Sequence, residues 1–295
     1  MASENAKSHN NEDFQLQSVF NVALITGGGS GIGLMATQAL AVNGAKVYIV
    51  GRTEEKLQTV ANTYSQGIEG QIIPITADIS KKDSIAKLYD EIAQKEDHLD
   101  ILINNAGISS TTFNTDATSA EELKKALFDN SDATFEDWEQ VYRVNVGQLY
   151  FTTTAFLPLL QKATEKTKSW SGTVVNISSI SGQVKLTQHH PQYNASKAAA
   201  TRLTRQLANE IQSSGLKIRI NSISPGVFPS EMTTSESGAN QKSEIPKEKF
   251  EGKVPAQRPG NDRDMAGAVL FAVTNQYFNG QNLTVDGGYE LSAGI

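Results

Sequence analysis

Short apolar runs alternate along the chain with longer segments in which apolar residues recur every three or four positions. The apolar runs predict strands at residues 21–26, 46–50, 71–77, 100–104, 172–178, 218–223 and 282–285. The periodic segments predict helices at residues 34–43, 54–64, 84–94, 135–161, 195–212 and 262–274. Strands that alternate with helices form a parallel sheet covered on both faces. We therefore expect one α/β domain of the doubly wound Rossmann type, with seven strands.

Two segments interrupt this alternation. Residues 109–131 are mostly polar, with a possible short helix at 121–128, and residues 227–259 contain four prolines. Both segments follow predicted strands at their carboxyl ends, where ligands bind in open α/β sheets, so we expect them to be substrate loops. We assign residues 16–295 to the single domain. Residues 1–15 are polar with mixed charge, and we expect a disordered tail there.

Composition narrows the possible functions. The chain has 295 residues, a net charge of −6, no cysteine and four histidines. The acidic balance argues against a nucleic-acid partner, and the ligand count argues against a metal site. No run approaches the ~20 apolar residues of a membrane span. The polar N-terminus resembles neither a signal peptide nor a transit peptide, so we expect a cytoplasmic protein without a membrane partner.

A glycine-rich segment, TGGGSGIG, lies between the first predicted strand and the first predicted helix. Its glycines at Gly27, Gly31 and Gly33 follow the spacing T-G-x-x-x-G-x-G. Glycines allow a sharp turn and a close approach of the backbone to a pyrophosphate, whose charge meets the free N–H groups at the helix N-terminus. This segment predicts a dinucleotide site, although by itself it does not indicate a reaction.

The end of the second predicted strand bears on the choice of dinucleotide. A cofactor with a free ribose 2′-hydroxyl usually meets an acidic residue at this position. Here the position holds Gly51, and Arg52 follows. A cation without a competing carboxylate suits a 2′-phosphate, which favours NADP(H) over NAD. The alternative is that Arg52 only caps the edge of the sheet. Ser30 stands where NADP enzymes often carry a second basic residue.

Seven motifs then follow one another along the chain. They are TGGGSGIG, Asp78 in ADIS, NNAG at 104–107, Asn145 in VYRVNVG, ISSISG at 177–182, YNASK at 193–197 and SPG at 224–226. In this order they resemble the short-chain dehydrogenase/reductase family, in its common single-domain form. The segment PGVFPSEMT adds a weaker resemblance to fungal members and to bacterial 3-oxoacyl reductases of the rhamnolipid type.

The motif YNASK suits carbonyl reduction. A hydride transferred to a carbonyl requires a proton for the nascent alkoxide, and Tyr193 can donate one. Lys197 lies one helical turn later on the same face, so we expect its ammonium to lower the pKa of the tyrosine. The resemblance implies that Lys197 also binds the nicotinamide ribose. It further implies that Asn145 holds a water that links Lys197 to solvent.

The catalytic serine has three candidates in ISSISG. The family's serine stands three residues before the glycine, which selects Ser179 over Ser178 and Ser181. The distance from Ser179 to Tyr193 is one residue longer than the family spacing, with the extra residue in TQHHPQ. Strand alternation directs Ser178 to the opposite face from Ser179, and Ser181 fits a turn.

The remaining cofactor contacts are implied by the resemblance. Near the glycines and the adenine they are Gly27, Ser30, Gly31, Ile32, Gly33, Arg52, Asp78 and Ile79, and along the ribose they are Asn105, Ala106 and Gly107. Along the nicotinamide they are Tyr193, Lys197, Pro225, Gly226, Phe228 and Ser230.

Other residues near these motifs favour structural roles. Asn104 is expected to tie strands together, and Trp138 and Tyr142 to pack between helices. His189 and His190 are either solvated or at the border of the pocket.

These observations predict an NADP(H)-dependent carbonyl reductase or alcohol dehydrogenase. Two alternatives stay open: a cyclase or isomerase of the same fold that recycles its NADP, and a non-catalytic NADP-binding regulator. The resemblance implies a homotetramer or homodimer built on the helices that carry Asn145 and Tyr193. The two long loops contain residues suited to a medium-sized, partly apolar carbonyl substrate, namely Phe113, Leu123, Leu127, Phe128, Phe228 and Met232.

Overall fold

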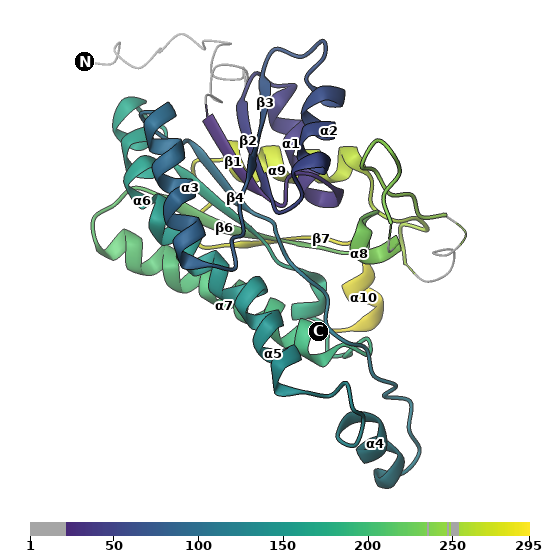
Figure 1. Cartoon of the computed structure of the whole chain (residues 1–295). Coiled ribbons are helices and arrows are strands. Elements are labelled where there is room, and N and C mark those ends of the chain that lie inside the picture. The colour runs from purple at the N-terminus through teal and green to yellow at the C-terminus, as the bar shows by residue number, and fades with distance from the viewer. Residues whose placement is uncertain (1–21, 235, 247, 249–253) are drawn as a thin grey trace, which may run out of the picture.

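Seven parallel strands form the centre of the molecule, in the order β3-β2-β1-β4-β5-β6-β7 (Figure 1). The computed structural model describes residues 22–234, 236–246, 248 and 254–295. The strands are β1 (Val22–Thr26), β2 (Lys46–Gly51), β3 (Gln71–Thr76), β4 (Ile101–Asn104), β5 (Thr173–Ile177), β6 (Arg219–Pro225) and β7 (Asn282–Val285). The predicted single seven-stranded domain is confirmed, with strand ends shifted by at most two residues. The predicted tail at 1–15 lies outside the described residues.

Helices cover both faces of the sheet. One face carries α1 (Gly31–Ala41), α2 (Glu54–Tyr64) and α9 (Asp262–Thr274) (Figure 1). The other face carries α3 (Lys82–Lys95), α6 (Gln148–Lys166) and α7 (Pro191–Ser213). Two hydrophobic clusters result, one on each side of the sheet. Because β1, β4 and β5 are buried along their whole length, the positions of their carboxyl ends are firmly fixed.

The strand order reverses between β1 and β4. The chain leaves β1 toward β2 and β3, and it returns to place β4 on the other side of β1. The loops that follow β1 and β4 therefore diverge and leave a crevice at the carboxyl ends of the strands. This crevice contains the glycine-rich segment after β1 and Asn105 after β4.

The long helix predicted over residues 135–161 is instead three successive segments. These are α5 (Phe135–Tyr142), a π-helical turn over Arg143–Gly147, and α6 (Gln148–Lys166). Hydrophobic periodicity does not reveal a π-turn, because one extra residue in a turn leaves the apolar pattern on either side intact. The turn contains Asn145, which is buried.

Residues 109–134 project away from the sheet and carry α4 (Ala120–Leu127) at their far end (Figure 1). No residue of α4 is buried. The predicted helix at 121–128 is thus present, displaced by one residue. Three short helices, α8 (Glu231–Thr234), α10 (Tyr289–Ala293) and a 3₁₀ turn over Ile180–Gly182, had no expected counterpart. Such short pieces are fixed by tertiary contacts rather than by a periodic pattern.

Candidate active site

The N-terminus of α1 faces the crevice without a side-chain cap. Its N-cap residue Ser30 makes no side-chain hydrogen bond to the first turn, and that turn holds no acidic residue. An N-terminus of this kind attracts an anion, because its N–H groups and the helix dipole favour negative charge. The local geometry therefore suits a phosphate group.

Two of the glycines allow backbone segments to approach closely. A Cβ atom on Gly33 would lie 2.0 Å from the carbonyl oxygen of Gly27, and Gly27 itself has φ +65°. The Asn105 side chain closes this contact, since its amide donates to the carbonyls of Thr26 and Gly27, both at 3.0 Å. Asn105 thus fastens the segment after β4 to the glycine turn after β1.

Two cations lie where β2 meets α2. Arg52 and Lys56 both line the crevice, and of these two only Arg52 was predicted to contact the cofactor. Lys56 pairs with the carboxylate of Glu231 on α8 at 2.6 Å. This pair lowers the pKa of Glu231, and it connects α8 to α2 beside the N-terminus of α1. Because Lys56 lies in the first helical turn after Arg52, a second cation at this end of the cavity could have been predicted from the sequence.

Asp78 lies after β3, on the far side of Arg52. Its carboxylate accepts hydrogen bonds from the backbone N–H and the hydroxyl of Ser80, at 3.1 and 2.7 Å, and it pairs with Lys81 at 3.1 Å. The Ser80 hydroxyl is the main cause that lowers the pKa of Asp78. The carboxylate thus fixes the turn from β3 into α3, beside Ile79.

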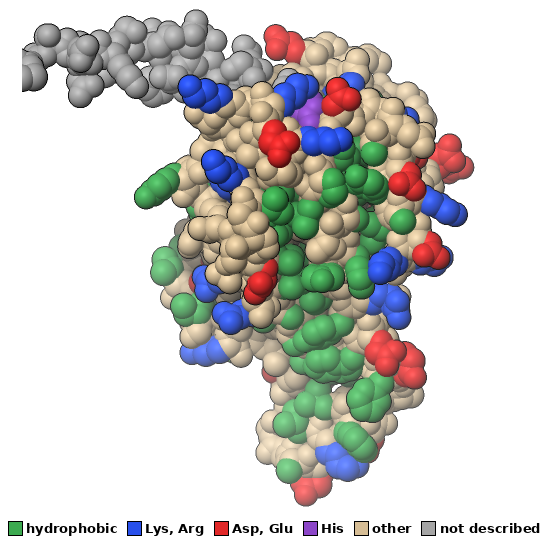
Figure 2. Space-filling view, turned by 90° about the vertical axis from the view of Figure 1, so that its left-hand side faces the viewer, with side chains coloured by type: hydrophobic (Ala, Val, Ile, Leu, Met, Phe, Trp, Pro, Cys, Tyr) green, Lys and Arg blue, Asp and Glu red, His purple; other side chains and the backbone are tan. Residues whose placement is uncertain are grey.

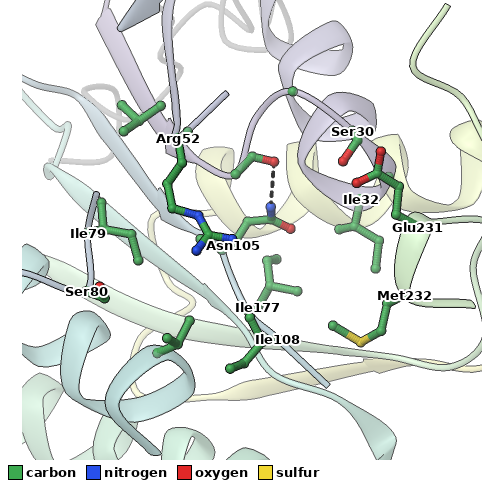
Figure 3. A pocket seen from close by; sticks show the side chains of 18 of the residues that line it. Ser30, Ile32, Arg52, Ile79, Ser80, Asn105, Ile108, Ile177, Glu231 and Met232 are labelled. Atoms are coloured by element: carbon green, nitrogen blue, oxygen red, sulfur yellow. Dashed lines mark hydrogen bonds between the residues drawn. The ribbon is translucent and has the colours of Figure 1, made fainter. Parts of the chain in front are cut away.

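These elements enclose one elongated cavity of about 640 Å³. Figure 3 shows Arg52 and Ile79 on one side and Ser30, Ile32, Glu231 and Met232 on the other, with Ile108 and Ile177 between them. The cavity runs from the glycine turn to the N-terminal part of α7. The predicted site residues that line it are Gly27, Ser30, Gly31, Ile32, Arg52, Asp78, Ile79, Asn105, Ala106, Gly107, Tyr193, Lys197 and Ser230.

Tyr193 lines the end of the cavity at α7, and Ser179 adjoins Tyr193 without itself lining the cavity. Ser179 follows β5, and its hydroxyl oxygen accepts a hydrogen bond from the N–H of Ser181 at 3.1 Å. Burial raises the pKa of Tyr193 to about 12, while a hydrogen bond with Ser179 lowers it. The Ser179 hydroxyl thus adjoins the phenol, whereas Ser178 lines the cavity.

The raised pKa of Tyr193 runs opposite to the sequence-based expectation. Lys197 lies over the tyrosine ring, with Nζ 5.6 Å from the ring centre. Its ammonium donates to the carbonyl of Ile177 at 3.0 Å rather than to the phenol oxygen. The phenol is consequently desolvated without a cation at its oxygen, and desolvation disfavours the phenolate. Burial likewise lowers the pKa of Lys197 to about 8.

Asn145 joins the π-turn to two neighbouring segments. Its side-chain oxygen accepts from the N–H of Ile108 at 2.9 Å, and its amide donates to the Ile108 carbonyl at 3.0 Å and to Ser196 at 3.1 Å. A Cβ on Gly107 would lie 3.2 Å from the Asn145 oxygen and 3.4 Å from Lys197 Nζ. Asn145 and Lys197 therefore face the same glycine.

Some predicted cofactor residues do not line this cavity. Phe228 is 3% exposed and belongs to the hydrophobic core, and a Cβ on Gly260 would lie 2.3 Å from its ring. Its side chain thus packs away from the cavity, because the chain after β6 directs it under α9. Gly33 approaches Gly27 closely, Pro225 ends β6 and Gly226 follows it, and none of these three residues lines the cavity.

The two long loops behave differently from each other. From residues 227–259 the cavity takes Ser230, Glu231 and Met232, while residues 235, 247 and 249–253 lie outside the described part of the chain. Residues 109–131 contribute nothing to the cavity lining, contrary to expectation, because the segment projects away from the sheet (Figure 1). Phe128 at its far end is 77% exposed.

The residues predicted to be structural take such roles. Asn104 donates to Thr153 at 3.0 Å and to Asn176 at 2.9 Å, which ties β4 to α6 and β5. Trp138 stacks on Tyr142 with ring centres 6.3 Å apart. Among the described residues there is no group of three His, Asp or Glu side chains able to hold a metal ion. Over the same residues, no helix is long and apolar enough to span a bilayer.

Comparison with known proteins agrees with this geometry. A family model described as short chain dehydrogenase matches residues 21–241. The chain belongs to the short-chain dehydrogenase/reductase family. The fungal short-chain dehydrogenase/reductase PhomF′ of Diaporthe leptostromiformis is 37% identical over 272 residues, with 90% of each chain covered. The rhamnolipids biosynthesis 3-oxoacyl-[acyl-carrier-protein] reductase of Pseudomonas aeruginosa is 32% identical, with 92% of this chain and 96% of that protein covered.

Solved structures of short-chain dehydrogenases/reductases share the fold. The RhlG/NADP active-site complex of Pseudomonas aeruginosa superposes with a TM-score of 0.75 at 29% identity, over 91% of this chain and 96% of that chain. A short-chain type dehydrogenase/reductase from Mycobacterium marinum gives a TM-score of 0.74 at 27% identity, over 94% and 98%. The chain thus carries the family motifs and matches these relatives over nearly their whole length.

Proposed function

We propose that the protein is an NADP(H)-dependent oxidoreductase that reversibly reduces a ketone or aldehyde to an alcohol. The observation that supports this most strongly is that Tyr193 and Lys197 line one end of a cavity, with Ser179 beside Tyr193, while the other end holds an uncapped helix N-terminus and two cations. Similarity to an NADP complex and to proteins named 3-oxoacyl reductases supports both the cofactor and the carbonyl substrate.

The phosphate end of the cavity suits NADP(H). The N–H groups of the first turn of α1 would hold the pyrophosphate, and Arg52 and Lys56 would hold the 2′-phosphate. Gly51 and Arg52 at the end of β2 offer no carboxylate to a ribose 2′-hydroxyl. Lys56 is paired with Glu231, so it would exchange this partner for the 2′-phosphate. Bound in this way, NADPH would supply the hydride.

The catalytic end would bind and protonate the carbonyl oxygen. The Ser179 oxygen already accepts the N–H of Ser181, and its one hydroxyl proton would be donated to the substrate oxygen. A tyrosine with a pKa near 12 is fully protonated at neutral pH and is ready to donate. Lys197 then limits the cost of the phenolate left behind, through its charge over the ring.

The test is NADPH oxidation followed at its absorbance band with three carbonyl probes: ethyl acetoacetate, acetoacetyl-coenzyme A and acetophenone. We expect turnover with at least one probe, and a loss of at least about a hundredfold in Tyr193→Phe with its melting temperature preserved. Tight NADPH binding without turnover would instead indicate a regulator. Full activity in Tyr193→Phe would contradict the mechanism, whereas conversion of a substrate without steady NADPH oxidation would favour a cyclase or isomerase that recycles its NADP.

We also propose a second copy of the chain as partner. Helices α5 and α6 carry exposed aromatic side chains, namely Phe135, Trp138, Tyr150 and Phe151. Figure 2 shows a hydrophobic band that runs down this side of the molecule. Hydrophobic side chains also gather on the projecting part of the molecule (Figure 2). Leu123 and Phe128 of the projecting segment are both exposed. A contiguous apolar surface of this kind favours burial between copies, as a homodimer or homotetramer.

A further inference from the structure

A tight turn just before α7 has an unusual backbone. The N–H of His190 donates to the carbonyl of Thr187 at 3.0 Å, which closes the turn around Gln188 and His189. Both central residues have positive φ, +52° and +66°. Two positive φ values in succession are the mark of a type I′ turn, whose central positions favour Asn and Gly. Here they hold Gln and His, for which the left-handed region is unfavourable.

The turn is held in place from the side of the projecting segment. The carbonyl of His189 accepts the N–H of Phe113 at 2.7 Å, and the His189 ring lies 3.1 Å from the hydroxyl of Thr115. Surrounding structure of this kind is what maintains a strained conformation, and such strain concentrates at functional sites. The turn therefore fixes the position of the Gln188 side chain.

Gln188 lies in a chain of hydrogen bonds that reaches Ser179. The hydroxyl of Ser181 donates to Oε1 of Gln188 at 2.6 Å, and the N–H of Ser181 donates to the Ser179 hydroxyl oxygen at 3.1 Å. On its other side, Nε2 of Gln188 donates to the hydroxyl of Tyr289 on α10 at 3.2 Å. The chain thus runs from α10 through Gln188 and Ser181 to Ser179, which adjoins Tyr193.

We propose that Gln188 is a positioning residue for Ser179, a role that rests on the proposed carbonyl reduction. Both ends of its amide are already engaged, by Ser181 and Tyr289, so Gln188 acts through Ser181 rather than by touching substrate. It fixes the 3₁₀ turn over Ile180–Gly182. Within this turn the N–H of Ser181 determines which lone pair of the Ser179 hydroxyl oxygen is occupied. The strained turn is the means by which the chain places this amide beside Ser181.

The experiment measures kcat and KM for the best of the three carbonyl probes, with NADPH, in Gln188→Ala, Ser181→Ala and the double variant. We expect each single variant to lose about tenfold in kcat, the value of one hydrogen bond, and the double variant to lose no more than either single one. The KM for NADPH should not change, because neither side chain lines the cavity. Gln188→Glu keeps the acceptor for Ser181 and should restore most of the rate.

Gln188→Gly separates positioning from mere structural support. Glycine relieves the positive φ at this position while removing the amide, so we expect an equal or higher melting temperature together with the same tenfold loss of kcat. Thr187→Ala, an exposed neighbour in the same turn, is the matched control and should keep wild-type rates.

Three results would overturn the inference. The first is wild-type kcat in Gln188→Gly or Gln188→Ala while Tyr193→Phe is inactive, which would leave the proposed function intact. The second is additive losses in the double variant, and the third is losses of kcat that only follow losses of melting temperature. Absence of wild-type turnover with all three probes would overturn the proposed function and this inference together.

Discussion

Lys197→Met isolates the cost of burying a charge at the centre of the site. Lys197 is 4% exposed, and burial lowers the pKa of its ammonium from 10.5 to about 8. At about 1.4 kcal/mol per pKa unit, the charged lysine costs the folded state about 3 kcal/mol at neutral pH. Methionine removes this cost, but it also removes the hydrogen bond to the Ile177 carbonyl, worth about 1 kcal/mol. We therefore expect Lys197→Met to be more stable by about 2 kcal/mol.

The sign of the pH dependence follows from the direction of the shift. The pKa of Lys197 is lower in the folded than in the unfolded chain, so between about 8 and 10.5 the unfolded chain binds more protons. Wild-type stability consequently rises through this window relative to Lys197→Met. Below pH 8 the variant keeps its full advantage. Near pH 10.5 only the lost hydrogen bond remains, and the variant becomes the less stable protein by about 1 kcal/mol.

Urea unfolding of both proteins at about pH 6, 8 and 10 measures this difference. Lys87→Met, which removes an exposed lysine from α3, is the matched control for the loss of a positive charge. The same Lys197→Met protein should lose NADPH-dependent turnover. A variant less stable than wild type at pH 6, with a difference that does not change with pH, would refute the reasoning. Such a result would mean that Lys197 stabilises the folded state rather than destabilising it.

Three further predictions concern the cofactor and the assembly. Arg52→Ala and Lys56→Ala should each raise the KM for NADPH by about tenfold and leave that for NADH nearly unchanged; equal effects on both would contradict a 2′-phosphate site. Gly33→Ala should abolish dinucleotide binding in a fluorescence titration, because its Cβ would lie 2.0 Å from the Gly27 oxygen. Phe151→Glu should lower the molar mass measured by light scattering, because a charge in the hydrophobic band opposes burial between copies. An unchanged mass would show that this surface is not the interface between copies.

Hydrophobic periodicity was sufficient to predict the sheet. Buried strands such as β1 and β5 are continuous apolar runs, and the helices between them repeat their apolar residues every three or four positions. The glycine turn was predictable for a different reason, since only glycine fits where backbones meet at Gly27 and Gly33. In both cases the physical requirement acts on neighbouring residues, and the sequence therefore records it directly.

The features that sequence missed depend on residues far apart in the chain. Phe228 looked like a nicotinamide contact, but its ring packs against Gly260 and the core under α9. The expected lowering of the Tyr193 pKa assumed an ammonium at the phenol oxygen, whereas Nζ of Lys197 is held by the Ile177 carbonyl. Helical spacing places two residues on one face, but it does not fix where a flexible lysine head finds its partner.

The conformation of segment 187–190 depends both on neighbouring residues and on residues far away in the chain. The sequence revealed an extra residue between Ser179 and Tyr193, which a surface loop absorbs at little cost. A freely accommodated insertion would relax into an ordinary turn, with glycine or asparagine at any position of positive φ. Gln188 and His189 instead keep an unfavourable backbone while contacting Ser181, Tyr289 and Thr115. Strain that persists while these contacts are made indicates that the contacts, and not the length of the loop, determine this part of the site.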